Sequence, residues 1–216
     1  MVPSSLLAEL VERVLVSFGR EAAEPHAFGG TLGSRIVLWA ERAQEWNQRI
    51  DLTAARSAEE LIDLLVADAA ALARASSAAR NETWIDVGSG VGAPGLALAL
   101  LMPDLRFNLV EPKDKRVAFL RSVVGHLALT SVVVTRARSQ ALPPRCVDVA
   151  VSRATLPPAE WLAEGARLAR RRVWVLLAQG TPPEAAGWEL ESDVSYDWPL
   201  TGARRRAVSY VLRAGS

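Results

Sequence analysis

Closely spaced glycines and a carboxylate are the residues in this sequence whose types and spacing best fit a chemical role. The stretch Gly88–Ser89–Gly90–Val91–Gly92 joins an expected strand over residues 83–87 to an expected helix over residues 95–102. Glycine tolerates positive φ and has no Cβ to keep a ligand away from the backbone. Glu111 ends the next expected strand, where its carboxylate can accept hydrogen bonds from both hydroxyls of a ribose. Glu111 lies 19 residues after Gly92. A glycine turn followed by an acid at this spacing predicts a site for a nucleoside-containing cofactor.

The residues around the turn also bear on which cofactor binds there. Gly90, Gly92 and Gly95 satisfy the G-x-G-x-x-G pattern, so NAD is an alternative. Asp86, two residues before the first glycine, could help to hold an ammonium group, directly or through water. S-adenosylmethionine carries an ammonium group and NAD does not, so we favour S-adenosylmethionine. A tight turn that only packs against the sheet is the structural alternative.

The expected secondary structure changes near residue 81, from helices alone to alternating strands and helices. Residues 4–80 have mostly helical spacing of apolar residues. Ser57 and Glu60 fit a capping box, which predicts a helix from about residue 58 to about Ala79. From residue 83 onward, strands and helices alternate, which predicts a parallel sheet covered on both faces.

The end of the chain breaks this alternation. Residues 187–198 and 204–213 have the pattern of two strands with no helix between them, so they should pair antiparallel. We expect an α/β fold with an N-terminal helical extension over residues 1–80 and a catalytic domain over residues 81–216. The catalytic domain resembles Rossmann-like class I methyltransferases that use S-adenosylmethionine: a seven-stranded, mostly parallel sheet with a terminal antiparallel strand.

Composition excludes several classes of protein. The 216 residues are 50% hydrophobic and carry a formal net charge of +1, so overall charge favours no particular partner. The single cysteine, Cys146, cannot form an intramolecular disulfide, and we expect no metal site. The longest apolar run, residues 96–102, is too short to span a bilayer, and the N-terminus does not fit a signal peptide. We therefore expect a cytoplasmic protein without membrane association, and a monomer.

Several segments together resemble one family, the GidB/RsmG bacterial methyltransferases that modify guanine N7 in 16S ribosomal RNA. The segment NQRIDLTAARSAEEL, residues 47–61, resembles the N-L-T-x-x-R segment of that family. DVGSGVGAPGLALAL, with Pro94 before Gly95, resembles its D-V-G-[ST]-G-x-G-x-P-G segment. LVEPKDKRVAFLRSV and the S-R-A of residues 152–154 complete the likeness, which is good over about residues 40–155.

The resemblance implies roles for individual residues. It places the methionine end of S-adenosylmethionine around the glycine turn, the ribose on Glu111, and the adenine beside Ser139 and Gln140. Arg153 is implied near the site of methyl transfer, and it also borders the cofactor. The implied cofactor-binding residues are Asp86, Gly88, Ser89, Gly90, Ala93, Glu111, Ser139, Gln140 and Arg153.

The sequence departs from the family on the substrate side. In place of the family's H-x-x-D-S it has Leu65 and Ala69 around a retained Asp68, and Gln179 stands where the family has Lys. In the family these positions face the substrate. The departures leave open either a divergent member acting on the same RNA or a relative with another acceptor. A non-enzymatic relative that binds cofactor or RNA is a third possibility.

The expected reaction requires no proton transfer by the catalytic residues. Guanine N7 has a free lone pair and carries no proton, so transfer needs alignment rather than a general base. Asp68 could stabilise the cationic product base, with a structural carboxylate as its alternative role. Arg153 could orient the base or its phosphate, or it could simply pair with a nearby carboxylate.

Contacts with the RNA partner, 16S ribosomal RNA or the small ribosomal subunit, should come from arginines. Lys113 and Lys115 are the two lysines, so 23 of the 25 basic residues are arginine, which binds phosphate in a bidentate manner. The candidates for phosphate contact are Arg56, Arg138, Arg204 and Arg205. A solvated surface is the alternative for each of them.

Overall fold

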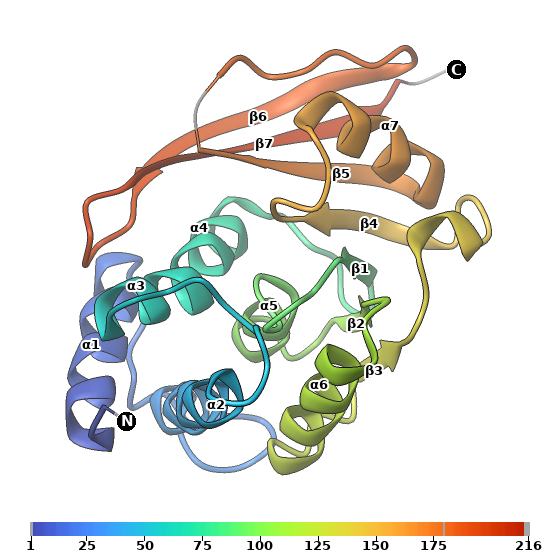
Figure 1. Cartoon of the computed structure of the whole chain (residues 1–216). Helices are drawn as coiled ribbons and strands as arrows, with labels where there is room; N and C mark the ends of the chain where they lie inside the picture. The colour runs from blue at the N-terminus through green and yellow to red at the C-terminus, as the bar shows by residue number, and fades with distance from the viewer. Residues whose placement is uncertain (1, 179, 214–216) are drawn as a thin grey trace.

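A computed structural model describes residues 2–178 and 180–213 of the chain. Four α-helices and one π-helical turn precede the first strand, and strands and helices then alternate until the C-terminal hairpin (Figure 1). The helices are α1 (Ser4–Ser17), α2 (Leu32–Asn47), α3 (Ala58–Ile62), the π-helical turn η1 (Asp63–Ala67), α4 (Asp68–Ala75), α5 (Gly95–Leu101), α6 (Asp114–His126), the 3-10 turn η2 (Ser139–Ala141) and α7 (Pro158–Leu168). The strands are β1 (Thr83–Val87), β2 (Arg106–Val110), β3 (Val132–Thr135), β4 (Val147–Ser152), β5 (Ala169–Leu177), β6 (Trp188–Asp197) and β7 (Arg204–Leu212).

The strands form one seven-stranded sheet in the order β3-β2-β1-β4-β5-β7-β6. Strands β1 to β5 pair in parallel, and β7 lies antiparallel between β5 and β6. The predicted mostly parallel sheet with an antiparallel C-terminal strand is therefore confirmed. The parallel strands β1, β2 and β4 end at the same edge, so the residues that follow them lie close together.

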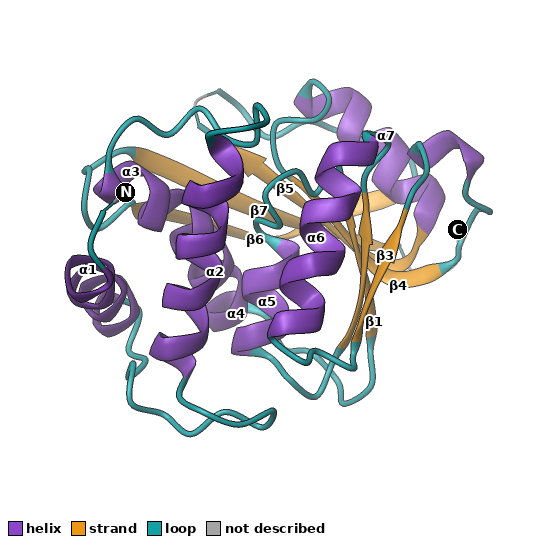
Figure 2. Cartoon of the chain, turned by 60° about the horizontal axis from the view of Figure 1, so that its bottom comes forward, coloured by secondary structure: helices purple, strands orange, loops and turns teal. Residues whose placement is uncertain are grey.

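Helices cover the two faces of the sheet unequally. The helices before β1, together with α5 and α6, pack on one face, and α7 packs against β4 and β5 on the other (Figure 2). The larger apolar core joins the N-terminal helices to α5, α6 and the inner side chains of the sheet, including Trp39, Trp84 and Phe119. Because this core is continuous between the helical extension and the sheet, the extension is packed as part of the same unit. The division into residues 1–80 and 81–216 stays a prediction.

The helical extension differs from the sequence-based expectation in two places. Ser57 caps α3 by accepting a hydrogen bond from the Glu60 N–H at 3.1 Å, but the Glu60 carboxylate accepts the N–H of Arg56 at 2.8 Å instead of that of Ser57. Only half of the expected capping box is therefore formed. The helical segment continues through the π-turn and ends at Ala75, before the expected end near Ala79.

A π-helical turn inside this segment is the feature that apolar spacing did not predict. It adds a residue to one helical turn, and such insertions often occur at functional sites. No helix in the described part of the chain is long and apolar enough to cross a membrane.

Candidate active site

The glycine turn begins directly after β1 and has a backbone that few other residues could adopt. Gly88, Gly90 and Gly92 have φ values of 72°, 55° and 101°. A Cβ on Gly88 would also lie 2.2 Å from the hydroxyl oxygen of Thr155. The N–H of Gly88 donates to the carbonyl of Val110 at 2.8 Å, which fixes the turn to the end of β2. At Gly88, conformation and space therefore both require glycine, and at Gly90 and Gly92 the positive φ favours it.

Asp86 lies beneath the turn and holds the start of α5. Its side chain is fully buried, and Oδ2 accepts the N–H of Gly95 at 3.0 Å. Gly95 leaves room for this contact, because a Cβ there would lie 2.6 Å from the Cβ of Asp86. The other carboxylate oxygen, Oδ1, is buried without a hydrogen-bond partner in the described chain. Burial raises the pKa of Asp86 from 3.8 to about 6, and the Gly95 hydrogen bond opposes that rise.

Glu111 is held at the end of β2 by two backbone groups. Oε2 accepts the N–H of Gly90 at 3.0 Å, and Oε1 accepts the N–H of Lys113 at 2.9 Å. The residue is only 2% exposed. Each carboxylate oxygen has two lone pairs, so both oxygens can still accept from a ribose hydroxyl. The contact with Gly90 also fixes the acid beside the glycine turn.

A cavity of about 390 Å³ opens over these groups; we call it the glycine-turn cavity. Its walls come from the 52–54 segment, the glycine turn, the start of α6 and the end of β4. The lining residues are Leu52, Thr53, Ala54, Leu64, Gly88, Ser89, Gly90, Val91, Ala93, Glu111, Pro112, Lys113, Arg116, Arg153, Ala154 and Thr155. Bare backbone beside a fixed carboxylate fits the ribose and amino-acid parts of S-adenosylmethionine, and the unpartnered oxygen of Asp86 lies below the turn, outside the lining of the cavity.

Three of the predicted cofactor residues lie outside the lining of this cavity. Asp86 is enclosed below the turn, so a direct contact with an ammonium group would need the turn to open or a water to intervene. Ser139 is buried in η2, where its carbonyl accepts from Arg167 at 2.8 Å. Gln140 is exposed to solvent. Their roles toward the cofactor stay predictions.

The two predicted catalytic residues are brought together by the fold. Arg153 follows β4, and its Nη1 donates to the Leu64 carbonyl at 2.5 Å and to Asp68 Oδ2 at 3.3 Å. The side chain of Arg153 is 19% exposed and that of Asp68 only 3%, so Arg153 forms the accessible side of the pair. Arg153 does pair with a carboxylate, which is the structural role considered for it.

A second cavity, of about 400 Å³, adjoins the first through Leu64, Arg153 and Ala154; we call it the hairpin cavity. It lies between the ends of β4 and β5, the start of α7, and the β6–β7 hairpin. Its lining residues are Leu64, Asp68, Ser152, Arg153, Ala154, Leu156, Pro158, Trp161, Val175, Leu176, Leu177, Ala178, Tyr196, Trp198 and Arg205. The wall is mostly apolar, with few polar groups, as in sites that bind small organic molecules.

Two aromatic residues of this cavity were missed in the sequence analysis. Tyr196 Oη donates to Asp68 Oδ1 at 2.9 Å, and Trp198 Nε1 donates to the same oxygen at 2.7 Å. Burial beside Asp68 raises the pKa of Tyr196, so its hydroxyl keeps its proton. In the expected strand over residues 187–198, positions 196 and 198 share a face, but nothing local indicates which element that face meets. In the structure β6 ends at Asp197 and Trp198 follows it.

The four arginines predicted to contact RNA lie in different places. Arg56 is exposed beside a separate cavity, and Arg138 is exposed just before η2. The Arg204 side chain is 90% exposed and lies 3.8 Å from Asp197. Arg205 stacks over the Trp198 ring at 4.0 Å, inside the hairpin cavity. Of the four, Arg205 alone lines the cavity that adjoins Arg153.

The departures at Leu65 and Ala69 do not face a substrate site, contrary to the expectation. Leu65 is 1% exposed and Ala69 is fully buried, and both belong to the large apolar core. A His and a Ser in their places would have to be buried among apolar side chains here, so Leu and Ala suit this packing. The third departure, Gln179, lies outside the described residues.

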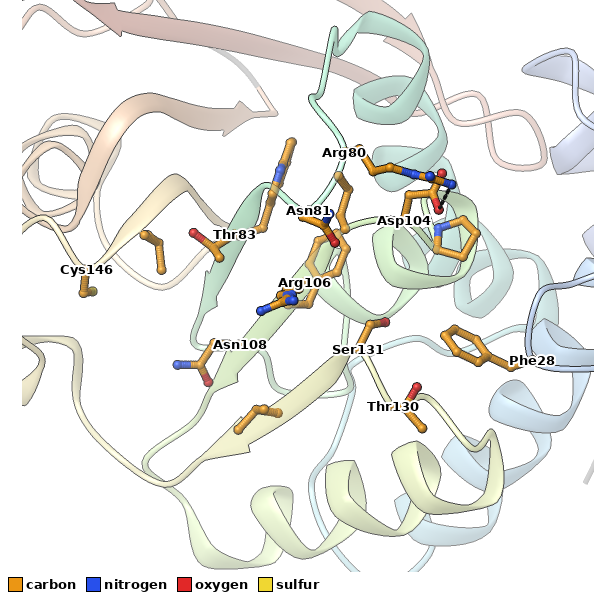
Figure 3. A pocket seen from close by; sticks show the side chains of 16 residues that line it. Phe28, Arg80, Asn81, Thr83, Asp104, Arg106, Asn108, Thr130, Ser131 and Cys146 are labelled. Atoms are coloured by element: carbon orange, nitrogen blue, oxygen red, sulfur yellow. Dashed lines mark hydrogen bonds and ion pairs between the residues drawn. The ribbon is translucent and has the colours of Figure 1, made fainter.

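A cavity larger than these two lies elsewhere, at the amino ends of β1 and β2 (Figure 3). It measures about 800 Å³ and is lined by polar side chains that include Thr83, Arg106 and Asn108. The Arg80–Asp104 ion pair lies at its rim. Ligands of open α/β sheets bind at the carboxyl ends of the strands, so this cavity is not the candidate active site. Among residues 2–178 and 180–213, no group of three or more His, Cys, Asp or Glu could hold a metal ion.

A seven-stranded sheet with β7 inserted antiparallel, a glycine turn after β1 and an acid after β2 define a Rossmann-like S-adenosylmethionine-dependent methyltransferase. Solved structures support this class. A SAM-dependent methyltransferase from Aquifex aeolicus superposes with a TM-score of 0.53 at 16% identity, covering 79% of this chain and 98% of that one. TrmN from Thermus thermophilus superposes with a TM-score of 0.51 at 20% identity, covering 81% and 53%.

Sequence comparison identifies the family within this class. The family model GidB, described as rRNA small subunit methyltransferase G, matches residues 34–196. Ribosomal RNA small subunit methyltransferase G of Sodalis glossinidius is 31% identical over 182 residues, covering 81% of this chain and 87% of that protein. The protein of the same name from Methylococcus capsulatus is 31% identical over 187 residues, covering 86% and 87%. The chain belongs to the GidB family.

Proposed function

We propose that this protein transfers a methyl group from S-adenosylmethionine to N7 of a guanine in 16S ribosomal RNA. The observation that carries the proposal is the position of Arg153, which lines both the glycine-turn cavity and the hairpin cavity. Cofactor in the first cavity and an acceptor base in the second would meet beside this residue. Membership of the GidB family supports ribosomal RNA as the acceptor.

The chain's own residues act by alignment. S-adenosylmethionine would supply a methyl group bound to a positively charged sulfur. The N7 lone pair of guanine would form the new N–C bond in line with the breaking S–C bond, whose electron pair would stay on sulfur. No proton moves, so no general base is needed. Glu111 would hold the ribose, the bare glycine turn would admit the amino-acid tail, and Arg153 would orient the base.

Asp68 contributes by holding Arg153 rather than by facing the base. It is 2% exposed, and Arg153, Tyr196 and Trp198 all donate to its carboxylate. A carboxylate enclosed in this way fixes the guanidinium that lines the cavities. We therefore assign Asp68 as a positioning residue and Arg153 as the residue that touches the substrate.

The helical extension, residues 1–80, would complete the site. Trp39 of α2 donates through Nε1 to the carbonyl of Val91 in the glycine turn at 3.0 Å. Asp51 accepts a hydrogen bond from Arg116 through its backbone carbonyl at 2.9 Å. The Arg116 contact holds the backbone directly before the 52–54 segment, which lines the glycine-turn cavity. A ribosomal RNA substrate would place the enzyme in the cytoplasm. We propose that it acts there as a monomer.

The proposal favours ribosomal RNA over another acceptor for a structural reason. The argument for a different acceptor depended on Leu65, Ala69 and Gln179. The first two are core residues, so their identity does not alter the walls of the hairpin cavity.

The test is transfer of labelled methyl from S-adenosylmethionine to 16S RNA and to 30S subunits from cells that lack their own enzyme. We expect the label to be recovered as 7-methylguanosine. The control is Glu111→Ala, which should lose cofactor binding and activity together. No label, with cofactor binding intact in the wild type, would overturn the ribosomal assignment.

A further inference from the structure

We propose that the β6–β7 hairpin forms the recognition wall for the acceptor guanine, which leaves its stack and lies in the hairpin cavity against the paired Trp198 and Arg205 side chains. Asp63 and Asp68, at the two ends of the π-helical turn, are positioning residues that hold this wall in place. The inference depends on the proposed function and adds the residues that recognise the base.

The π-turn brings the two aspartates to one side of the helix. Residues five apart in an α-helix point about 140° away from each other, at roughly 100° per residue. The turn η1 between Asp63 and Asp68 has the wider i→i+5 pattern, so residues five apart come close to one face. Both carboxylates consequently contact the same hairpin.

The contacts of the two aspartates fix both the end of β6 and the loop that follows it. Asp63 accepts from the N–H of Leu200 at 3.2 Å, and from the N–H and hydroxyl of Thr201 at 2.8 Å each. Asp68 accepts from Tyr196, near the end of β6, and from Trp198, two residues further along the chain. Figure 1 shows this end of the hairpin beside α3. Asp63 is fully buried and Asp68 is 2% exposed, so these charge-assisted hydrogen bonds are shielded from water.

Arg205 differs from its two neighbours in having no carboxylate partner. In the run Arg204 to Arg206, Arg204 lies near Asp197 and Arg206 pairs with Asp193. Arg205 donates to the carbonyl of Arg204 and stacks on Trp198, and no residue among 2–178 and 180–213 forms an ion pair with it. A half-buried guanidinium held flat on an indole in a mostly apolar cavity is suited to a polar planar group.

An unstacked guanine has the matching chemistry. Enzymes that modify a base within RNA extrude it into a pocket and read it by stacking and by hydrogen bonds to its edge. Single-stranded bases stack on aromatic rings and on arginine planes. Pro158, Trp161 and Val175 also line the cavity, and Arg153 lines both this cavity and the glycine-turn cavity. A guanine in this position has its N7 edge free to face the cofactor side.

The test compares Arg205→Ala with Arg206→Ala, a matched control that removes the same charge from the adjacent residue of the same strand, where Arg206 pairs with Asp193. Kinetics with 30S subunits are measured together with the Kd of S-adenosylmethionine. We expect Arg205→Ala to raise KM by about 10-fold or more, as stacking energies per base indicate. Arg206→Ala should change KM by less than about 2-fold. Equal effects would show that the run acts only through general phosphate attraction and would overturn the inference.

Trp198 provides the second test. Trp198→Phe keeps an aromatic face but removes the hydrogen bond to Asp68, and Trp198→Ala removes both. We expect Trp198→Ala to raise KM by about 10-fold or more and Trp198→Phe to recover most of that loss, with the Kd of S-adenosylmethionine unchanged in both. Equal loss in both variants would overturn the stacking role. Absence of methyl transfer by the wild type would instead overturn the proposed function.

Discussion

Asp86 gives the clearest quantitative prediction, because its carboxylate is buried with one oxygen unpartnered. Burial raises its pKa from 3.8 to about 6 in the folded protein. One pKa unit corresponds to about 1.4 kcal/mol, so ionising this group in the fold costs about 3 kcal/mol. The perturbation is Asp86→Asn, which keeps the shape and an oxygen for the Gly95 N–H but cannot ionise.

The sign of the pH dependence follows from the raised pKa. Between the unfolded value of 3.8 and the folded value of about 6, the folded state binds more protons than the unfolded state. Stability from this group is therefore fully present below 3.8 and is lost as the pH rises through about 6. The free energy of unfolding of the wild type, relative to Asp86→Asn, should fall by about 3 kcal/mol between about pH 4 and pH 7.5.

The assay is urea unfolding of both proteins across this pH range, without cofactor. Asp63, whose pKa is also raised by burial, contributes equally to both proteins and cancels in the difference. The unsatisfied amide hydrogens of the Asn shift its stability by a constant that does not depend on pH. A difference between the two proteins that stays flat with pH would refute the argument that Asp86 is desolvated.

The same variant tests the cofactor role of Asp86. An ammonium group near the carboxylate would stabilise its charged form, so S-adenosylmethionine should bind the wild type more tightly as the pH rises through about 6. The Kd of Asp86→Asn should lack this dependence. Identical pH profiles of the Kd would leave Asp86 with only its structural role at Gly95.

Three further predictions follow from single contacts. Gly88→Ala should weaken S-adenosylmethionine binding, measured by calorimetry, by about 10-fold or more, because positive φ costs an alanine about 1–2 kcal/mol and its Cβ meets Thr155. Combining Gly88→Ala with Thr155→Ala should recover part of this affinity. Asp68→Asn should lower kcat by about 10-fold or more with an unchanged Kd for S-adenosylmethionine, since it frees Arg153 without touching the glycine turn. A parallel loss of cofactor binding would contradict the positioning role of Asp68. Thr31→Ala should lower the free energy of unfolding by about 1 kcal/mol in urea titrations and leave kcat unchanged, because Thr31 caps α2 far from the site. A change in kcat would show that α2 is coupled to catalysis.

Much of the fold was predictable because it depends on local patterns. Apolar periodicity and turn residues located the strands and most helices, and the absence of a helix between residues 198 and 204 predicted the antiparallel hairpin. The π-turn and the end of the helical segment at Ala75 were not predictable in this way. In a buried helical segment, the spacing of apolar residues does not reveal that one residue has been inserted.

The sequence by itself determined the glycine turn, the acid at the end of β2 and the arginine after β4, because each follows its own strand by a short, fixed spacing. The tertiary structure alone decided which distant residues meet them. Asp68 lies 85 residues from Arg153 and 128 residues from Tyr196, and it contacts both. It also decided that Leu65 and Ala69 are core residues rather than part of the substrate wall. Spacing along the chain determines which way a side chain points within its own element, whereas its partner depends on how the elements pack, and packing is a property of the whole core.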